Sequence, residues 1–84
     1  MFKLIVSLSI KNMKLSDAKV GFTFEVISIS NEKLLSDALR FGIETNSRLK
    51  VIAKLPGGPV VIQKEELQIA IGKNLAEAIE VREK

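Results

Sequence analysis

Hydrophobic and polar residues alternate along several segments of this chain, with the period of two that is typical of β-strands. In the first segment, residues 1–12, apolar side chains hold every second position. These side chains are Phe2, Leu4, Val6, Leu8 and Ile10. Serines interrupt the run, and no small-residue cleavage site follows it, which argues against a signal peptide. We therefore expect residues 1–12 to form an extra strand, paired either at an edge of its own barrel or with a neighbouring chain.

Residues 22–29 alternate as well, but their pattern changes phase. Phe22, Phe24 and Val26 share one face, whereas Ile27 and Ile29 occupy the other. The change predicts a bulge or sharp bend near residues 26–27. Before this strand, residues 15–18 suggest a short helical turn with Ser16 as its N-cap.

The pattern then changes to the spacing of a helix over residues 30–41. Ser30 or Asn31 can cap its start, and Gly42 suits the left-handed position that follows a helix end. The expected apolar face consists of Leu34, Leu35, Ala38, Leu39 and Phe41. Asn46, in the polar loop that follows, tolerates a positive φ angle.

A hairpin is predicted over residues 48–62, around the turn Pro56-Gly57-Gly58-Pro59. Proline presets φ at the second position of a type II turn, and Gly57 supplies the positive φ that the third position requires. In the strand before the turn we expect alternate positions to point inward, namely Leu49, Val51, Ala53 and Leu55.

The rest of the chain adds short elements of the same kind. Residues 67–71 alternate, residues 74–79 read as one turn of helix, and residues 79–82 form a final strand. The expected fold is therefore mainly β. It is a small, partly open barrel of five to six strands with one α-helix, at about 31–41, and short helical turns.

Composition narrows the possible chemistry. The 84 residues contain no cysteine and no histidine, which removes thiolate and imidazole as metal ligands and nucleophiles. Glu65 and Glu66 are adjacent, so on a strand they would point to opposite faces and form a poor chelating pair. No catalytic constellation is recognisable. We expect a protein without enzyme activity, cofactor or metal site.

The net charge of +3 carries little information, because residues 15–84 hold ten basic and ten acidic side chains. Arg48, Lys50 and Lys54 alternate along one predicted strand and would share its exposed face. Three interpretations stay open: a docking stripe for an acidic partner, a weak nucleic-acid site, or an ordinary solvated surface. Base-stacking aromatics are scarce, which argues against binding of single strands.

A series of short motifs follows in order along residues 13–82. They are Met13-Lys14-Leu15-Ser16-Asp17, Gly21, Val26-Ile27-Ser28-Ile29, Leu39-Arg40-Phe41-Gly42-Ile43, Leu49-Lys50-Val51, Pro56-Gly57-Gly58-Pro59-Val60, Ile69-Ala70-Ile71 and Ala76-Glu77-Ala78-Ile79. In order and spacing these motifs resemble the FeoA family. The resemblance implies an SH3-like barrel over residues 13–84 and a role as the small cytosolic partner of the ferrous-iron transporter FeoB. A similar barrel forms the C-terminal domain of metal-dependent repressors.

The chain also departs from the family pattern. Thr45-Asn46-Ser47 replaces the usual Pro-Gly pair after the helix, and Ser36 and Asp37 stand where basic residues are common. The strand predicted at residues 1–12 has no counterpart in the family, and we expect that its residues 2–10 could mediate self-association.

The working hypothesis is a cytoplasmic binding module that reaches the membrane only through a FeoB-type transporter. Its expected contacts are Leu35 on the helix and the turn formed by Leu55, Pro56, Gly57 and Gly58. The alternatives are an SH3-like interaction module related to the repressor domains, or a weak nucleic-acid binder.

Overall fold

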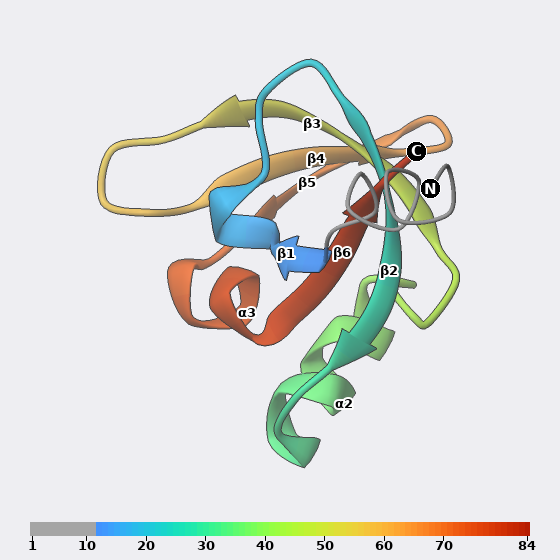
Figure 1. Cartoon of the computed structure of the whole chain (residues 1–84). Helices are drawn as coiled ribbons and strands as arrows, with labels where there is room; N and C mark the ends of the chain where they lie inside the picture. Colours follow the sequence, from blue (N-terminus) through green and yellow to red (C-terminus); the bar gives the residue numbers. More distant parts are fainter. Residues whose placement is uncertain (1–11) are drawn as a thin grey trace, which may run out of the picture.

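The computed structural model describes residues 12–84, so the strand predicted for residues 1–12 lies outside the described part except for Asn12. In chain order the elements are β1 (Asn12–Lys14), the 3-10 helix η1 (Leu15–Asp17), β2 (Thr23–Ile29), α2 (Glu32–Arg40), β3 (Arg48–Lys54), β4 (Val60–Lys64), β5 (Leu67–Ile71), α3 (Lys73–Ala78) and β6 (Ile79–Glu83) (Figure 1).

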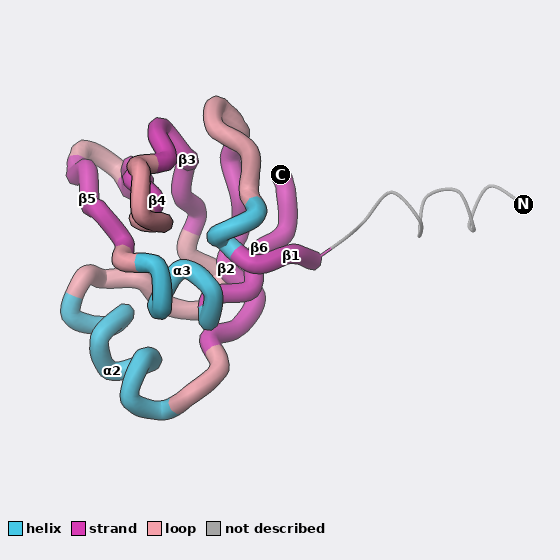
Figure 2. Tube along the Cα trace, turned by 90° about the vertical axis from the view of Figure 1, so that its left-hand side faces the viewer, coloured by secondary structure: helices cyan, strands magenta, loops and turns pink. Residues whose placement is uncertain are grey.

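The six strands form one curved antiparallel sheet in the order β1-β6-β2-β3-β4-β5. The strands β1 and β5 are its two edges, and Figure 2 shows them on opposite sides of the molecule. The helices α2 and α3 lie below β3, β4 and β5 in both views. The prediction of a mainly β fold with five to six strands and one principal helix is confirmed.

The sheet encloses a purely apolar core, since no polar or charged residue is among the buried ones of residues 12–84. Alternate strand residues supply most of this core, as their period of two requires. Its members are Leu15, Ala18, Phe24, Val26, Ala38, Ile43, Leu49, Val51, Val60, Ile62, Ile71, Leu75, Ala76, Ile79 and Val81.

A bulge in β2 explains the change of phase seen in the sequence. The pairing of β2 with β6 shifts register between Val26 and Ser28, at the predicted place. Val26 N donates to Ser47 O and Asn46 N donates to Val26 O, both at 2.8 Å. The bulge therefore also holds the loop that follows α2.

A second bulge, in β3, was not predicted, and it makes the expected orientation of Leu55 wrong. The register of β3 against β4 shifts between Val51 and Ala53, so the inward alternation stops there. Ala53 is only half-buried, and Leu55 is 44% exposed. An extra residue in one strand of a ladder has this effect, because it reverses the faces of all residues beyond it.

The ends of α2 follow the predicted local chemistry. Of the two candidate caps, Asn31 is the one used: its Oδ1 accepts hydrogen bonds from the backbone N–H groups of Lys33 (2.9 Å) and Leu34 (3.3 Å). Gly42 and Asn46 adopt positive φ angles of 75° and 76°. The helix itself is slightly shorter than predicted.

The prediction of Ser16 as an N-cap is wrong. Ser16 lies inside the 3-10 turn η1, whose N-cap position is Lys14, and no side chain caps it. The turn is closed instead by the backbone, with Ala18 N donating to Leu15 O at 3.0 Å, and it is anchored by the complete burial of Leu15.

Among the described residues, none of the helices has the length and apolar character needed to cross a bilayer.

Candidate protein interaction surface

The helix α2 presents apolar side chains that the core does not cover. Ala38 is completely buried and Leu34 is half-buried against the core. Leu35 is 38% exposed, Leu39 51% and Phe41 45%. The predicted apolar face is thus only partly a core face. The i, i+4 pair Leu35 and Leu39 forms a neighbouring ridge on the helix surface. We call Leu35 and Leu39 the α2 patch.

Both ends of α2 are fixed to the rest of the molecule. Before the helix, Ser30 N donates to Ala78 O at 3.0 Å. After it, Ile43 is fully buried, and the Asn46–Ser47 segment is bonded to Val26 in β2. The α2 patch is therefore held in one position by backbone bonds on either side, although its own side chains are exposed.

A groove separates α2 from α3. It has a volume of about 600 Å³ and is lined from the α2 side by Asn31, Lys33, Leu34 and Asp37, and from the α3 side by Gly72, Lys73, Asn74 and Leu75. Its walls mix apolar and charged groups of both signs. This composition suits the polar edge of a protein contact better than the enclosed site of a small ligand.

The turn between β3 and β4 has the predicted geometry. Gly58 N donates to Leu55 O at 3.2 Å, and Leu55 N donates to Pro59 O at 2.8 Å. Gly57 has a φ angle of 93°, as the third position of a type II turn requires. Leu55 is exposed at this tip and offers an apolar contact.

Lys73 connects the turn to the helices. A Cβ atom placed on Gly58 would lie 2.8 Å from Lys73 Cγ, so the turn packs directly on the first residue of α3. Lys73 also lines the α2–α3 groove. Figure 1 shows α3 between the β3–β4 turn and α2. The residues Leu35 and Leu55 thus lie on two different elements that both border α3. No local pattern in the sequence points to this role of Lys73.

The three basic residues of β3 do not form one cluster. All are exposed, but Lys54 lies beyond the β3 bulge and its Nζ donates to Ser16 O at 3.1 Å. Arg48 and Lys50 lie at the opposite end of the strand, where they pair with β2. The predicted alternation on one face is broken by the same bulge that exposes Leu55.

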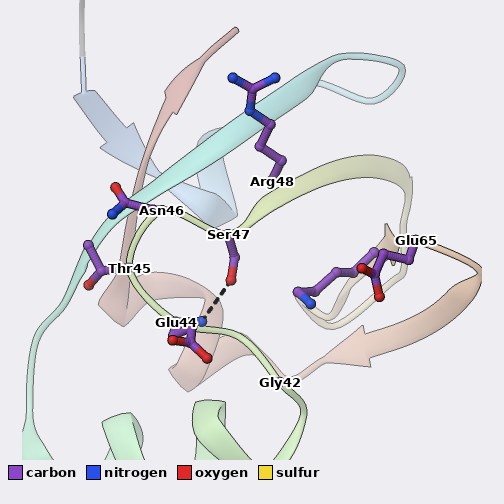
Figure 3. Close-up of a pocket in the computed structure, with 8 residues that line it drawn as sticks. Gly42, Glu44, Thr45, Asn46, Ser47, Arg48 and Glu65 are labelled. Carbon is purple, nitrogen blue, oxygen red and sulfur yellow. Dashed lines mark hydrogen bonds between the residues drawn. The ribbon is translucent and has the colours of Figure 1, made fainter.

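A polar cavity of about 400 Å³ lies between the loop after α2 and the β4–β5 turn (Figure 3). Ser47 Oγ accepts a hydrogen bond from Glu44 N at 3.0 Å, which closes the loop. Figure 3 shows the guanidinium of Arg48 pointing away from Glu44 and Glu65. The charged groups do not converge on one point, so this cavity offers no assembled site.

No group of three or more histidine, cysteine, aspartate or glutamate side chains with the spacing of a metal site occurs within residues 12–84. Glu65 lies in the turn after β4 with a φ angle of 57°. The described acidic side chains therefore provide no ligand set for a divalent ion.

The sequence profile of the FeoA domain matches residues 13–83. Among solved structures, the chain is similar to a crystal structure of the iron uptake regulatory protein FeoA, with 25% identity and a TM-score of 0.80. That match covers 88% of this chain and all of the other. A solution structure of FeoA from Chlorobium tepidum is 29% identical, with a TM-score of 0.73, over 84% of this chain and 70% of that one.

A manganese-dependent transcriptional repressor is similar as well, at 25% identity and a TM-score of 0.79. The match covers 87% of this chain but only 42% of the repressor, so the likeness concerns one part of that protein. A search of curated protein sequences gave no match. The fold expected from the resemblance, a small SH3-like domain, is confirmed. With its domain profile matched over residues 13–83, the chain belongs to the FeoA family.

Proposed function

We propose that this protein is a non-enzymatic accessory protein of ferrous-iron uptake, which works in the cytoplasm by docking on the cytosolic part of a FeoB-type membrane GTPase. The observation that carries the proposal is the α2 patch, an exposed apolar surface on a FeoA domain. One similar structure is described as an iron uptake regulatory protein, and family membership makes the same pathway the natural assignment here.

Docking would bury the α2 patch and the tip of the β3–β4 turn around Leu55. Exposed apolar side chains on a rigid frame gain free energy when a partner removes them from water, at about 25 cal/mol per Å². The mixed charges of the α2–α3 groove would form the rim of such an interface. The module would act by favouring one conformation of the transporter's cycle, without forming covalent bonds.

The proposal is tested with the purified cytosolic domain of the FeoB-type protein from the same organism, by titration calorimetry at near-physiological salt. Leu35→Asp and Leu39→Asp place a charge in the proposed contact and should weaken binding at least about tenfold. Val20→Asp is the matched control, since Val20 is 50% exposed and lies outside the α2 patch. Absence of binding by the unmodified chain contradicts the proposal, as does equal binding by all variants.

The repressor likeness supports a second candidate, an SH3-like module that binds another protein in metal-dependent regulation. It would use the same apolar surface but would not recognise the transporter domain. A nucleic-acid role is less favoured, because Lys54 is bonded to Ser16 O and lies far along β3 from Arg48. Binding to DNA that falls steeply with salt would support that role instead.

A further inference from the structure

The edge strand β5 is unusually open to pairing with another strand. It pairs with β4 in one continuous register, without the bulges that interrupt β2 and β3. Its five residues include no charge and no proline. Leu67 is 64% exposed, the largest exposed fraction among the exposed large hydrophobic residues of the described chain, 12–84. Natural sheets usually protect such an edge with lysine, proline or a bulge.

The other edge of the sheet differs. Within residues 12–84 the strand β1 consists of Asn12–Lys14 and carries the charge of Lys14, so the described part of this edge is a short ladder with a charge. Of the two edges, β5 therefore presents the longer row of backbone groups without a partner strand among residues 12–84, next to apolar side chains.

We propose that β5 is a strand-addition site, and that its occupant is the segment 2–10 of a second copy of this chain. Eleven residues precede Asn12, and every second position from Phe2 to Ile10 is apolar. A strand of five residues spans about 17 Å, so the segment is long enough to cover all of β5.

One antiparallel register fits both faces of the pair. It sets Ile10 opposite Leu67, Leu8 opposite Ile69 and Val6 opposite Ile71, which brings the apolar positions together. The same register sets Ser9 opposite Gln68 and Lys11 opposite Glu66 on the outer face. A slip by one residue would place the apolar side chains of the segment in solvent.

The donor is a second copy because the segment of the same chain cannot reach β5. Asn12 is paired with Arg82 in β6, whereas β5 lies four strands further along the sheet. Adjacent strands are about 4.8 Å apart, and the single residue between positions 10 and 12 spans only about 7 Å. Figure 2 shows β1 and β5 at opposite sides of the molecule. Reciprocal exchange between two copies gives a closed dimer.

The first test measures self-association of the full chain by sedimentation velocity over a range of concentrations. The unmodified chain should associate, and Leu67→Lys should raise the dissociation constant at least about tenfold by placing a charge at the pairing edge. Leu67 is exposed, so this variant should fold. Val20→Lys, at a similarly exposed residue elsewhere, is the matched control and should associate like the unmodified chain. A monomeric unmodified chain, or no effect of Leu67→Lys, overturns the proposal.

The second test determines the register and the donor. The chain has no cysteine of its own, so a Ser9→Cys chain mixed with a Gln68→Cys chain should form a disulfide-linked heterodimer under mild oxidation. Replacing the second chain by Ala70→Cys moves the thiol two residues along β5, and the yield should fall several-fold, because a disulfide needs Cα atoms within about 7 Å. Equal yields overturn the register. A Ser9→Cys/Gln68→Cys chain that forms its disulfide within one monomer overturns the exchange between copies.

Discussion

At the scale of single residues, Glu25 connects β2 with the end of β6. Its Oε1 lies 3.0 Å from Lys84 Nζ and 3.6 Å from Arg82 Nη2. The hydrogen bond from Lys84, aided by the positive charges of Lys84 and Arg82, lowers the pKa of Glu25 below its usual value of 4.5 despite some loss of hydration. Because the folded state holds the carboxylate ionised more strongly than the unfolded chain does, the pair stabilises the fold.

This stabilisation should depend on pH. For a carboxyl whose pKa is lowered by folding, the contribution is complete above the unfolded pKa and is lost as the pH falls through the folded pKa. Urea unfolding between about pH 6 and about pH 3 should therefore show a smaller loss of stability for Glu25→Gln than for the unmodified chain. Glu83→Gln is the control, since Glu83 is exposed and has no ion pair within the described residues. Identical pH profiles for Glu25→Gln and the unmodified chain would contradict the role of Glu25.

The sequence predicts the helix cap and the positive φ angles, but not the ion pairs of Glu25. Asn31, Gly42, Gly57 and Asn46 were predicted because capping and positive φ depend on the backbone nearby. Glu25 contacts Arg82 and Lys84, which follow it in the chain by 57 and 59 positions. No local pattern in the sequence encodes contacts over such a separation. The prediction for Ser16 is wrong because a serine near the start of a short turn resembles a cap, although here the backbone alone closes the turn.

At the scale of elements, the β3–β4 turn and α3 form a close contact. Gly58 has a φ angle of 109°, and its Cα hydrogen faces the Cβ, Cγ and Cδ atoms of Lys73. A side chain at this position would be strained by the backbone and would also press on Lys73. Gly57 has a similar φ angle of 93°, but a Cβ there meets only Pro59, at 4.0 Å.

The two glycines allow a matched comparison. We expect Gly58→Ala to lower the free energy of unfolding by about 2 kcal/mol and Gly57→Ala by about 1 kcal/mol, since both carry the backbone strain but only the first adds the steric contact. Lys73→Ala removes Cγ and Cδ, and should recover part of the difference in a double-mutant cycle. Urea denaturation of Gly57→Ala, Gly58→Ala, Lys73→Ala and the double variant Gly58→Ala/Lys73→Ala measures these losses. Equal losses for the two glycine substitutions would show that Lys73 adjusts without cost.

The existence of α2 could be predicted, but not how much of it is covered. A helical spacing of apolar residues shows that one side is hydrophobic, whereas the width of the buried part depends on which elements pack against it. Here Ala38 and Leu34 meet the core, while Leu35 and Leu39 do not. The docking role of Leu35 and of the turn residues stays a prediction, which the proposed titrations address.

At the scale of the whole molecule, one small core holds the six strands together. Ile62 lies on β4, between β3 and β5, and is completely buried. A domain of this size is stable by only about 5–10 kcal/mol, near 0.1 kcal/mol per residue. A single core position therefore accounts for a large share of the total.

Shortening the side chain of Ile62 should remove a large part of the stability of the domain. We expect Ile62→Ala to lower the free energy of unfolding by about 2–5 kcal/mol, because it removes buried methyl groups and leaves a cavity. Val61→Ala, at the next and only half-buried position, should cost less than half as much. Thermal and urea unfolding distinguish the two. Similar losses at both positions would mean that β4 does not direct Ile62 into the core and Val61 away from it.

The overall fold could be predicted because strand alternation and turn chemistry recur along the whole chain and agree with one another. The β3 bulge could not, because it arises from how β3 and β4 align, and the apolar run Val51-Ile52-Ala53 fits an unbroken inward alternation as well as a bulged one. That single extra residue moved Leu55 from the expected interior to the surface. It also placed Lys54 apart from Arg48 and Lys50.

The attachment of α2 at both ends has a consequence for recognition. Ser30 N is bonded to Ala78 O before the helix, and Asn46 N is bonded to Val26 O after it. In the proposed docking, the helix would reach its partner already in its binding conformation, so little backbone entropy would be lost during association. Changes in the exposed side chains should then act mainly on how long the complex lasts rather than on how fast it forms.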